Sequence, residues 1–376
     1  MGLKSMISKS AELVISMIPY KVYHRLYVNL FPYLHDARKR SSSYDYPYFI
    51  AKRKGAKERY CIFRYSIPTY GILAAGTQFL FAASWAERKG MIPLLDFELG
   101  YDFETYQLGK DNLWDAFFKQ PITIKGALKK DWVLVESLHS RGLHFHPIDK
   151  KINNKKNDYV LHMDIENWQE YYQNVQPYVS NIWSFRDDIL HNFNSICEGS
   201  IGNGKKVLGV LLREELSVEA DQYMTSKKAQ AIYEKHPKTI GISQTIDLIK
   251  KYMEEWECEK LFVATQFQDS LDAIQNVFGE KVLFIDRNRR YLEQLSHENS
   301  VWSQSNREFW EYYSQEEVRD SEYEKAKSYL CEIYILSKCE CFLASKCSGS
   351  TAALAMNGGN YANFCCLPDI NHSNKY

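Results

Sequence analysis

A small-residue loop near the C-terminus is the part of this 376-residue chain best suited to chemistry. The loop, Ser345–Ser350, lies between an expected strand, Cys341–Ala344, and a helix expected to begin at Thr351. Backbone N–H groups in the first turn of a helix have no acceptor within the helix and lie at the positive end of its dipole, so they can bind a diphosphate. The same residues are also typical of an ordinary serine cap on a core helix. The spacing alone leaves both interpretations open.

An arginine follows a second apolar strand. Val207–Leu212 is an unbroken apolar run, typical of a central parallel strand buried on both faces, and Arg213 comes directly after it. The carboxyl ends of parallel strands meet at one edge of a sheet, so we expect Arg213 to converge with the small-residue loop. A guanidinium and a helix N-terminus together make a strong diphosphate site. Glu214 and Glu215 follow, and their charges would repel a diphosphate unless they point elsewhere or bind a cation.

Strands and helices alternate along both halves of the chain, which indicates an α/β fold. In the N-terminal half, strands expected at 60–64 and 92–96 flank a helix expected at 73–88, which is a βαβ unit. Further strands are expected at 132–135, 260–265 and 281–285, and further helices at 112–121, 165–195 (with a break near Pro177), 243–257 and 268–278. We therefore expect two Rossmann-like domains that face a cleft, with ligands bound at the strands' carboxyl ends.

A Gly-rich segment, Gly199–Lys206, is the clearest linker. We place the boundary between two α/β domains there, with an N-terminal domain at 56–198 and a C-terminal domain at 205–376. A basic N-terminal arm and linker is expected at 1–55. Gly71, in the turn before the first helix, would let the backbone come close to a ligand, although turns need glycine for their own reasons.

Composition excludes several classes of function. Lys+Arg and Asp+Glu both number 47, so nucleic acid is a poor candidate for the main partner. The nine cysteines lack zinc-ligand spacing and indicate reduced thiols in a cytoplasmic protein, and His144 and His146 are more typical of surface residues than of metal ligands. We expect no metal.

Residues 1–40 form a basic arm in which apolar and aromatic residues alternate with lysines and arginines. This pattern favours peripheral contact with an anionic membrane, here the inner face of the cytoplasmic membrane, or a helix packed on the protein's body. It contains no recognisable secretory signal, and no segment of the chain has the length of a membrane span.

Several pieces of the chain, in order, resemble one superfamily. They are the Gly71 turn with its Ala-rich helix ending in GMIPLLD, NLWDAFFKQP, LGVLLR followed by KHPK, KLFVATQ with FGEKVLFID, and EIYILSKCECFLASKCSGSTAALA. Together they span most of residues 60–368 and resemble the GDP-fucose-dependent fucosyltransferases, a group of α-1,6-fucosyltransferases, chitin-oligosaccharide fucosyltransferases and protein O-fucosyltransferases. The resemblance is nearest to bacterial proteins of capsule and surface-polysaccharide gene clusters.

The resemblance implies a GT-B-like α/β fold and a fucosyltransferase-like glycosyltransferase, inverting and metal-independent, with a GDP-sugar such as GDP-fucose as donor and a glycan as acceptor. It assigns Arg213 to the departing diphosphate and Glu332 to the guanine base. Ser348, Gly349, Ser350 and Thr351 would hold the diphosphate, and Gly71 is counted with these donor-binding residues. We expect the acceptor in the N-terminal domain, near Gly71, Asp96 and His144. A solvated position on a helix is the alternative for Glu332.

This chain departs from the family where Glu214, Glu215 and Leu216 follow Arg213. Glu215 could be the base that deprotonates the acceptor hydroxyl. The departure also supports a different class of function, a non-catalytic sugar-nucleotide- or glycan-binding protein of a polysaccharide assembly complex. Topology alone leaves a third possibility, another nucleotide-dependent activity.

Overall fold

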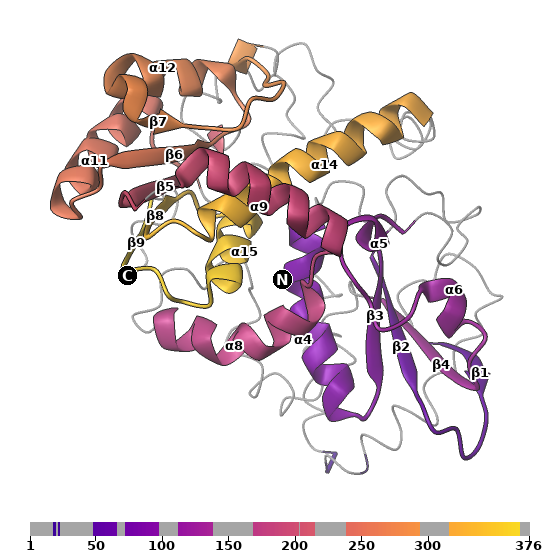
Figure 1. Ribbon diagram of the computed structural model, residues 1–376. Helices are drawn as coiled ribbons and strands as arrows, with labels where there is room; N and C mark the ends of the chain where they lie inside the picture. Colours follow the sequence, from indigo (N-terminus) through magenta and orange to yellow (C-terminus); the bar gives the residue numbers. More distant parts are fainter. Residues whose placement is uncertain are drawn as a thin grey trace, which may run out of the picture. The chain divides into compact units, whose positions relative to one another are not determined.

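The structure is a computed structural model that describes residues 18–19, 22, 48–65, 72–97, 112–137, 168–202, 204–214, 238–293 and 316–368. The chain divides into two compact units, Met1–Asp158 and Tyr159–Tyr376. Each unit has its own sheet, with the strands and helices labelled in Figure 1.

The sheet of the first unit has the strand order β1-β4-β2-β3. Its strands are β1 (Tyr48–Lys52), β2 (Tyr60–Tyr65), β3 (Ile92–Phe97) and β4 (Trp132–Ser137). β2 runs parallel to β3 and β4, whereas β1 is an antiparallel edge strand beside β4. The predicted βαβ unit is confirmed, because the helix α4 (Ile72–Arg88) connects the parallel neighbours β2 and β3.

Helices pack on both faces of this first sheet. On one face, Phe63 of β2 makes edge contacts with Phe79 and Trp85 of α4. On the other face, α6 (Ile124–Ala127) joins an apolar core of Tyr60, Ile62, Leu94, Ile124, Ala127, Val133 and Val135. The short helix α5 (Leu113–Phe117) is capped by Asn112, whose side chain also bonds the backbone of β3.

The sheet of the second unit is parallel throughout, in the order β7-β6-β5-β8-β9. The strands are β5 (Val207–Leu211), β6 (Lys260–Ala264), β7 (Val282–Leu283), β8 (Cys341–Ala344) and β9 (Asn363–Cys366). All five residues of β5 are buried, as its unbroken apolar run predicts for a central strand.

Helices cover both faces of this second sheet as well. The helices α11 (Ile242–Glu255) and α12 (Gln268–Phe278) share one apolar core with β5, β6 and β8. The helix α14 (Glu316–Leu336) lies on the opposite face and contacts α15 (Ser348–Asn357). A Cβ at Gly209 would lie 2.9 Å from Leu336 Cδ2 and 3.2 Å from Cys339 Sγ, so glycine lets α14 end directly against β5.

Two helices precede β5 in the second unit, α8 (Trp168–Ile182) and α9 (Asp187–Ile201). They contact α15 and α14 respectively, and the units therefore divide at Asp158 and Tyr159, earlier than the Gly199–Lys206 linker. The expected break near Pro177 is wrong, because α8 continues to Ile182. Packing against α15 outweighs the local cost of proline.

The predicted α/β class is confirmed in both units, with three corrections to its elements. The helix α15 begins at Ser348 rather than at Thr351. Only Val282 and Leu283 of the strand expected at 281–285 pair with β6, and the chain beyond them forms arginine contacts described below. The strand β9 was not predicted at all, because its sequence Asn363–Cys366 has no alternating pattern and pairs only through β8.

Candidate functional site: the carboxyl edge of the second sheet

Arg213 and the small-residue segment lie at the carboxyl ends of neighbouring strands. Leu211 of β5 is in register with Ala344 of β8. Beyond that pair, the Ser345 N–H donates to the Leu211 carbonyl at 2.9 Å, and the Arg213 N–H donates to Ser345 Oγ at 3.1 Å. These two bonds extend the parallel ladder past the strands, so the backbone at Arg213 and the loop before α15 are held together.

The first turn of α15 has backbone donors without a side-chain cap. Its N-cap residue is Cys347, whose side chain accepts no capping hydrogen bond, and the first helical bond runs from the Thr351 N–H to the Cys347 carbonyl at 3.2 Å. The N–H groups of Ser348, Gly349 and Ser350 precede that bond. The interpretation of this segment as an ordinary serine cap therefore does not hold in this structure.

The four residues of this turn, Ser348 to Thr351, differ in what they can do. Ser350 is fully buried and its hydroxyl donates to the Ser345 carbonyl. Thr351 is 6% exposed and its hydroxyl donates to the Cys347 carbonyl at 3.4 Å. Ser348 alone among the four is more than slightly exposed. Ser348 and the backbone can therefore reach a ligand, whereas Ser350 and Thr351 shape the turn.

Tyr329 of α14 lies against this turn. A Cβ at Gly349 would lie 2.1 Å from Tyr329 Oη, so the hydroxyl group occupies the space beside that glycine. Burial raises the pKa of Tyr329 well above its ordinary value, with the Cys347 thiol adding to the shift and the Arg213 guanidinium opposing it. The phenol is thus neutral, and it lies within electrostatic reach of both Arg213 and the loop.

Glu214 turns toward the other neighbour of β5. Its side chain is 6% exposed, and Oε1 accepts a short hydrogen bond from the Thr265 hydroxyl at the end of β6. Because β5 separates β6 from β8, this carboxylate is directed away from the strand that leads into α15. Oε1 of Glu214 is thus bound on the β6 side of β5, although Glu214 also lines a small pocket beside Arg213.

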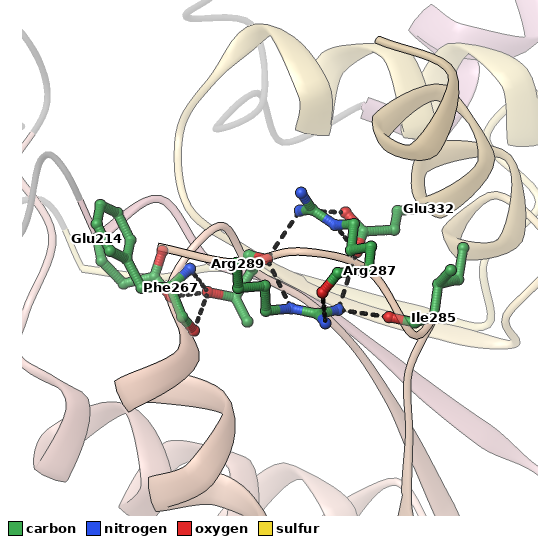
Figure 2. Close-up of polar contacts among 7 residues, drawn as sticks. Glu214, Phe267, Ile285, Arg287, Arg289 and Glu332 are labelled. Carbon is green, nitrogen blue, oxygen red and sulfur yellow. Dashed lines mark hydrogen bonds and ion pairs between the residues drawn. The ribbon is translucent and has the colours of Figure 1, made fainter. Parts of the chain in front are cut away.

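Two arginines and a glutamate form a buried cluster beside Thr265, which we call the arginine cluster (Arg287, Arg289, Glu332 and Thr265; Figure 2). Arg287 binds Glu332 through two parallel bonds, from Nε to Oε1 and from Nη2 to Oε2, both 2.9 Å. Arg287 Nη2 and Arg289 Nε donate to the Thr265 carbonyl at 2.9 Å and 3.3 Å. Arg289 Nη2 reaches the Ile285 carbonyl and Glu332 Oε1 at 2.8 Å and 3.3 Å.

The arginine cluster changes the interpretation of Glu332. Its side chain is 1% exposed, so the alternative of a solvated helix residue is wrong. Burial raises the pKa of the Glu332 carboxyl, and the charges of Arg287 and Arg289 oppose the shift. Both oxygens already accept from guanidinium groups, so a contact between Glu332 and a guanine base stays a prediction that requires Arg287 to move.

A small pocket opens beside Arg213. It is lined by Leu212, Arg213, Glu214, Thr239, Ile240, Ile242, Thr245, Ser270, Leu292, Ser345 and Leu367. Its volume is about 20 Å³, which holds about one water molecule and no nucleotide. A larger ligand would therefore have to lie along the carboxyl edge of the sheet, outside this pocket.

Other predicted residues fall in different places. Glu215, Gly71 and His144 lie outside the described residues. Asp96 is 1% exposed at the carboxyl end of β3, in register with Arg64 of β2, which is 5% exposed. Glu136, fully buried near the end of β4, was not predicted. The first sheet thus carries buried charged side chains near the carboxyl ends of all three of its parallel strands.

Sequence reasoning also missed the arginine cluster. Arg287 and Glu332 are 45 positions apart, so no local pattern links them. The run Asp286-Arg-Asn-Arg-Arg290 directly after an apolar strand was the available signal, since cations after parallel strands gather at the carboxyl edge.

The described part of the chain contains no group of three or more His, Cys, Asp or Glu side chains arranged to hold a metal ion. It also contains no helix that is long and apolar enough to cross a membrane.

No protein-family model and no curated protein matches this sequence. Among solved structures, it is similar to NodZ α-1,6-fucosyltransferase soaked with GDP-fucose (14% identity, 79% of this chain and 92% of that chain, TM-score 0.43). It is also similar to a mutant of Arabidopsis thaliana FUT1 in complex with GDP (9% identity, 85% of this chain and 73% of that chain, TM-score 0.41). A third similar structure is POFUT1 in complex with GDP (10% identity, 82% of this chain and 98% of that chain, TM-score 0.39).

Proposed function

We propose that this protein is a glycosyltransferase that transfers fucose, or a related sugar, from a GDP-sugar to a surface-polysaccharide acceptor, with inversion and without a metal ion. The observation that carries the proposal is the junction of Arg213 with the uncapped first turn of α15, at the carboxyl edge of neighbouring parallel strands. The ordered motif resemblance to GDP-fucose-dependent fucosyltransferases supplies the donor and the reaction class.

The proposed chemistry uses positive groups that the fold supplies. Cleavage of the sugar–phosphate bond builds negative charge on the departing GDP. The Arg213 guanidinium would stabilise that charge through paired hydrogen bonds, and the N–H groups of Ser348 and Gly349 would do so through the helix dipole. Glu215 would remove the proton of the acceptor hydroxyl. The acceptor would bind near the carboxyl edge of the first sheet, by Gly71, Asp96 and His144.

The orientation of Glu214 supports an active site over a degenerate one. The departure from the family at Glu214–Leu216 is the reason to consider a non-catalytic binding protein. However, Oε1 of Glu214 accepts a hydrogen bond from the Thr265 hydroxyl, on the β6 side of β5. Binding of GDP without turnover of any GDP-sugar, across a panel of acceptors, would still favour the non-catalytic function.

The test combines nucleotide binding with turnover. GDP should raise the thermal unfolding temperature of the wild-type protein more than UDP or ADP does, because ligand binding stabilises the folded state. Arg213→Ala should abolish that rise and lower GDP release from GDP-fucose by about a hundredfold, the typical effect of removing a donor to a developing negative charge.

Arg186→Ala is the matched control, since Arg186 is exposed and pairs with its near neighbour Asp188. It should change neither readout. Unchanged turnover in Arg213→Ala would remove the proposed mechanism. A larger shift with UDP or ADP than with GDP would instead favour another nucleotide-dependent activity.

A further inference from the structure

An exposed basic surface covers the end of the first unit that lies opposite its carboxyl edge. It consists of the turn between β1 and β2 and the segment before β4, residues 52–59 and 125–131. These residues include eight basic side chains against two acidic ones, whereas the whole chain has 47 of each kind. The basic side chains are Lys52, Arg53, Lys54, Lys57, Arg59, Lys125, Lys129 and Lys130.

Contacts between the two segments make this one continuous surface. The Arg53 N–H donates to the Asp131 carbonyl at 2.7 Å, and Lys130 Nζ bonds Glu58 Oε2 at 3.0 Å. Arg53 Nη1 also lies 3.6 Å from Asp131 Oδ1. Both acidic residues of the surface, Glu58 and Asp131, therefore pair with cations of the same surface. With eight basic and two acidic side chains, the residues of this surface carry a formal net charge of +6.

Apolar side chains lie among these cations. Lys52 is stacked over the Phe49 ring at 4.7 Å, and Arg59 over the Trp132 ring at 5.7 Å. Ile50 occupies the irregular position of β1, where the pairing with β4 shifts, and it is 42% exposed. An aliphatic side chain thus projects from an edge strand that ends in the basic turn.

The position of the surface separates it from substrate binding. Tyr60 and Val133, near the starts of β2 and β4, are in register beside it, so both parallel strands run away from it. Ligands of parallel sheets bind at the other edge, where the strands end. The basic surface therefore leaves the proposed acceptor edge open.

We propose that this basic surface docks the protein on a membrane that contains anionic lipids. Six of its eight cations are lysines, which act as hydrated point charges toward an extended anionic surface, whereas recognition of nucleic-acid phosphates and bases favours arginine forks. The exposed Ile50 can enter the lipid headgroup layer, which neither a nucleic acid nor a soluble polysaccharide offers. The docking proposal is independent of the glycosyltransferase proposal.

The experiment measures sedimentation of the full-length protein with vesicles of phosphatidylcholine, with and without phosphatidylglycerol. The wild-type protein should bind the anionic vesicles, and added salt should weaken binding because it screens exposed charges. The variant K54E/K57E/K125E/K129E should lose at least about tenfold in affinity. These four lysines are exposed, so their substitution leaves the buried core of the unit intact.

A matched control reverses the same number of exposed charges elsewhere, in K205E/K250E/K251E/K281E of the second unit. It should bind the vesicles like the wild type. If the charge-reversed surface variant unfolds early in a thermal scan, the milder K54Q/K57Q/K125Q/K129Q replaces it. An equal loss of vesicle affinity in the surface and control variants would overturn the proposal. Unchanged vesicle binding by the surface variants would overturn it as well. Tighter binding to DNA or to a soluble acidic polysaccharide than to anionic vesicles would show a different class of partner and would overturn it too.

Discussion

The arginine cluster and the basic surface are both rich in positive charge, yet they are built in opposite ways. In the arginine cluster, Arg287 and Arg289 are 14% and 1% exposed, and carbonyl and carboxylate oxygens fix their guanidinium groups. In the basic surface, lysines extend into solvent. The difference teaches that burial selects arginine, whose planar fork can satisfy several acceptors at once, whereas an extended surface field needs only exposed point charges.

The largest expected effect breaks the arginine cluster. Glu332→Ala removes the carboxylate that joins Arg287 and Arg289, and leaves buried guanidinium groups without their counter-charge. The free energy of unfolding should fall by about 3–5 kcal/mol, the usual cost of removing one partner of a buried ion pair. Urea denaturation measures this. Glu324→Ala, on the exposed side of the same helix, is the control, and equal midpoints for the two variants would contradict the role given to Glu332.

The second prediction exchanges the type of cation. Arg287→Lys keeps the charge but cannot make the paired bonds to Glu332 together with the bond to the Thr265 carbonyl. The free energy of unfolding should fall by about 1.5–3 kcal/mol, the value of a hydrogen bond to a charged group. The reverse exchange in the basic surface, Lys130→Arg, should leave the urea midpoint unchanged. A similar response at both positions would mean that geometry does not separate the two regions.

The third prediction tests the packing beside the cluster. Gly349→Ala places a methyl group 2.1 Å from Tyr329 Oη, so we expect a loss of about 1–3 kcal/mol in unfolding free energy. Adding Tyr329→Phe removes the hydroxyl oxygen and should recover part of that loss. Gly199→Ala in α9, where a Cβ meets no atom within 4 Å, should not destabilise the protein. Absence of any recovery in the double variant would show that Tyr329 is not the obstacle.

The smallest expected effect concerns pH and the exposed pair of the basic surface. Hydrogen bonds from Lys130 and then Tyr60 lower the pKa of Glu58 below its ordinary value of 4.5. Because the folded pKa is the lower one, the stabilisation is fully present above pH 4.5 and is lost as the pH falls through the folded value. The difference in urea midpoint between wild type and Glu58→Gln should therefore be small at neutral pH, shrink with added salt and vanish in acid. A difference in urea midpoint that grows as the pH falls would contradict this direction of the Glu58 pKa shift.

Local patterns were sufficient for most of the elements around the site. The apolar run at Val207–Leu211 became the central strand, and Gln268–Phe278 became a helix with the predicted bounds. The convergence of Arg213 with the segment before α15 also followed from the sequence, because parallel strands place their carboxyl ends together. The start of α15 at Ser348 did not follow from the sequence, since small residues suit a loop and a first helical turn equally well.

The sequence by itself determined the α/β class, the order of the strands along the chain and the cations that follow them, because these depend on periodicity and on neighbours in sequence. Only the tertiary structure decided the partners of those cations. It brings Glu214 into a hydrogen bond with Thr265, 51 positions away. It also brings Arg287 into an ion pair with Glu332, 45 positions away. The physical reason is that a buried charge must find a counter-charge, and which one it reaches depends on how strands and helices pack rather than on spacing along the chain.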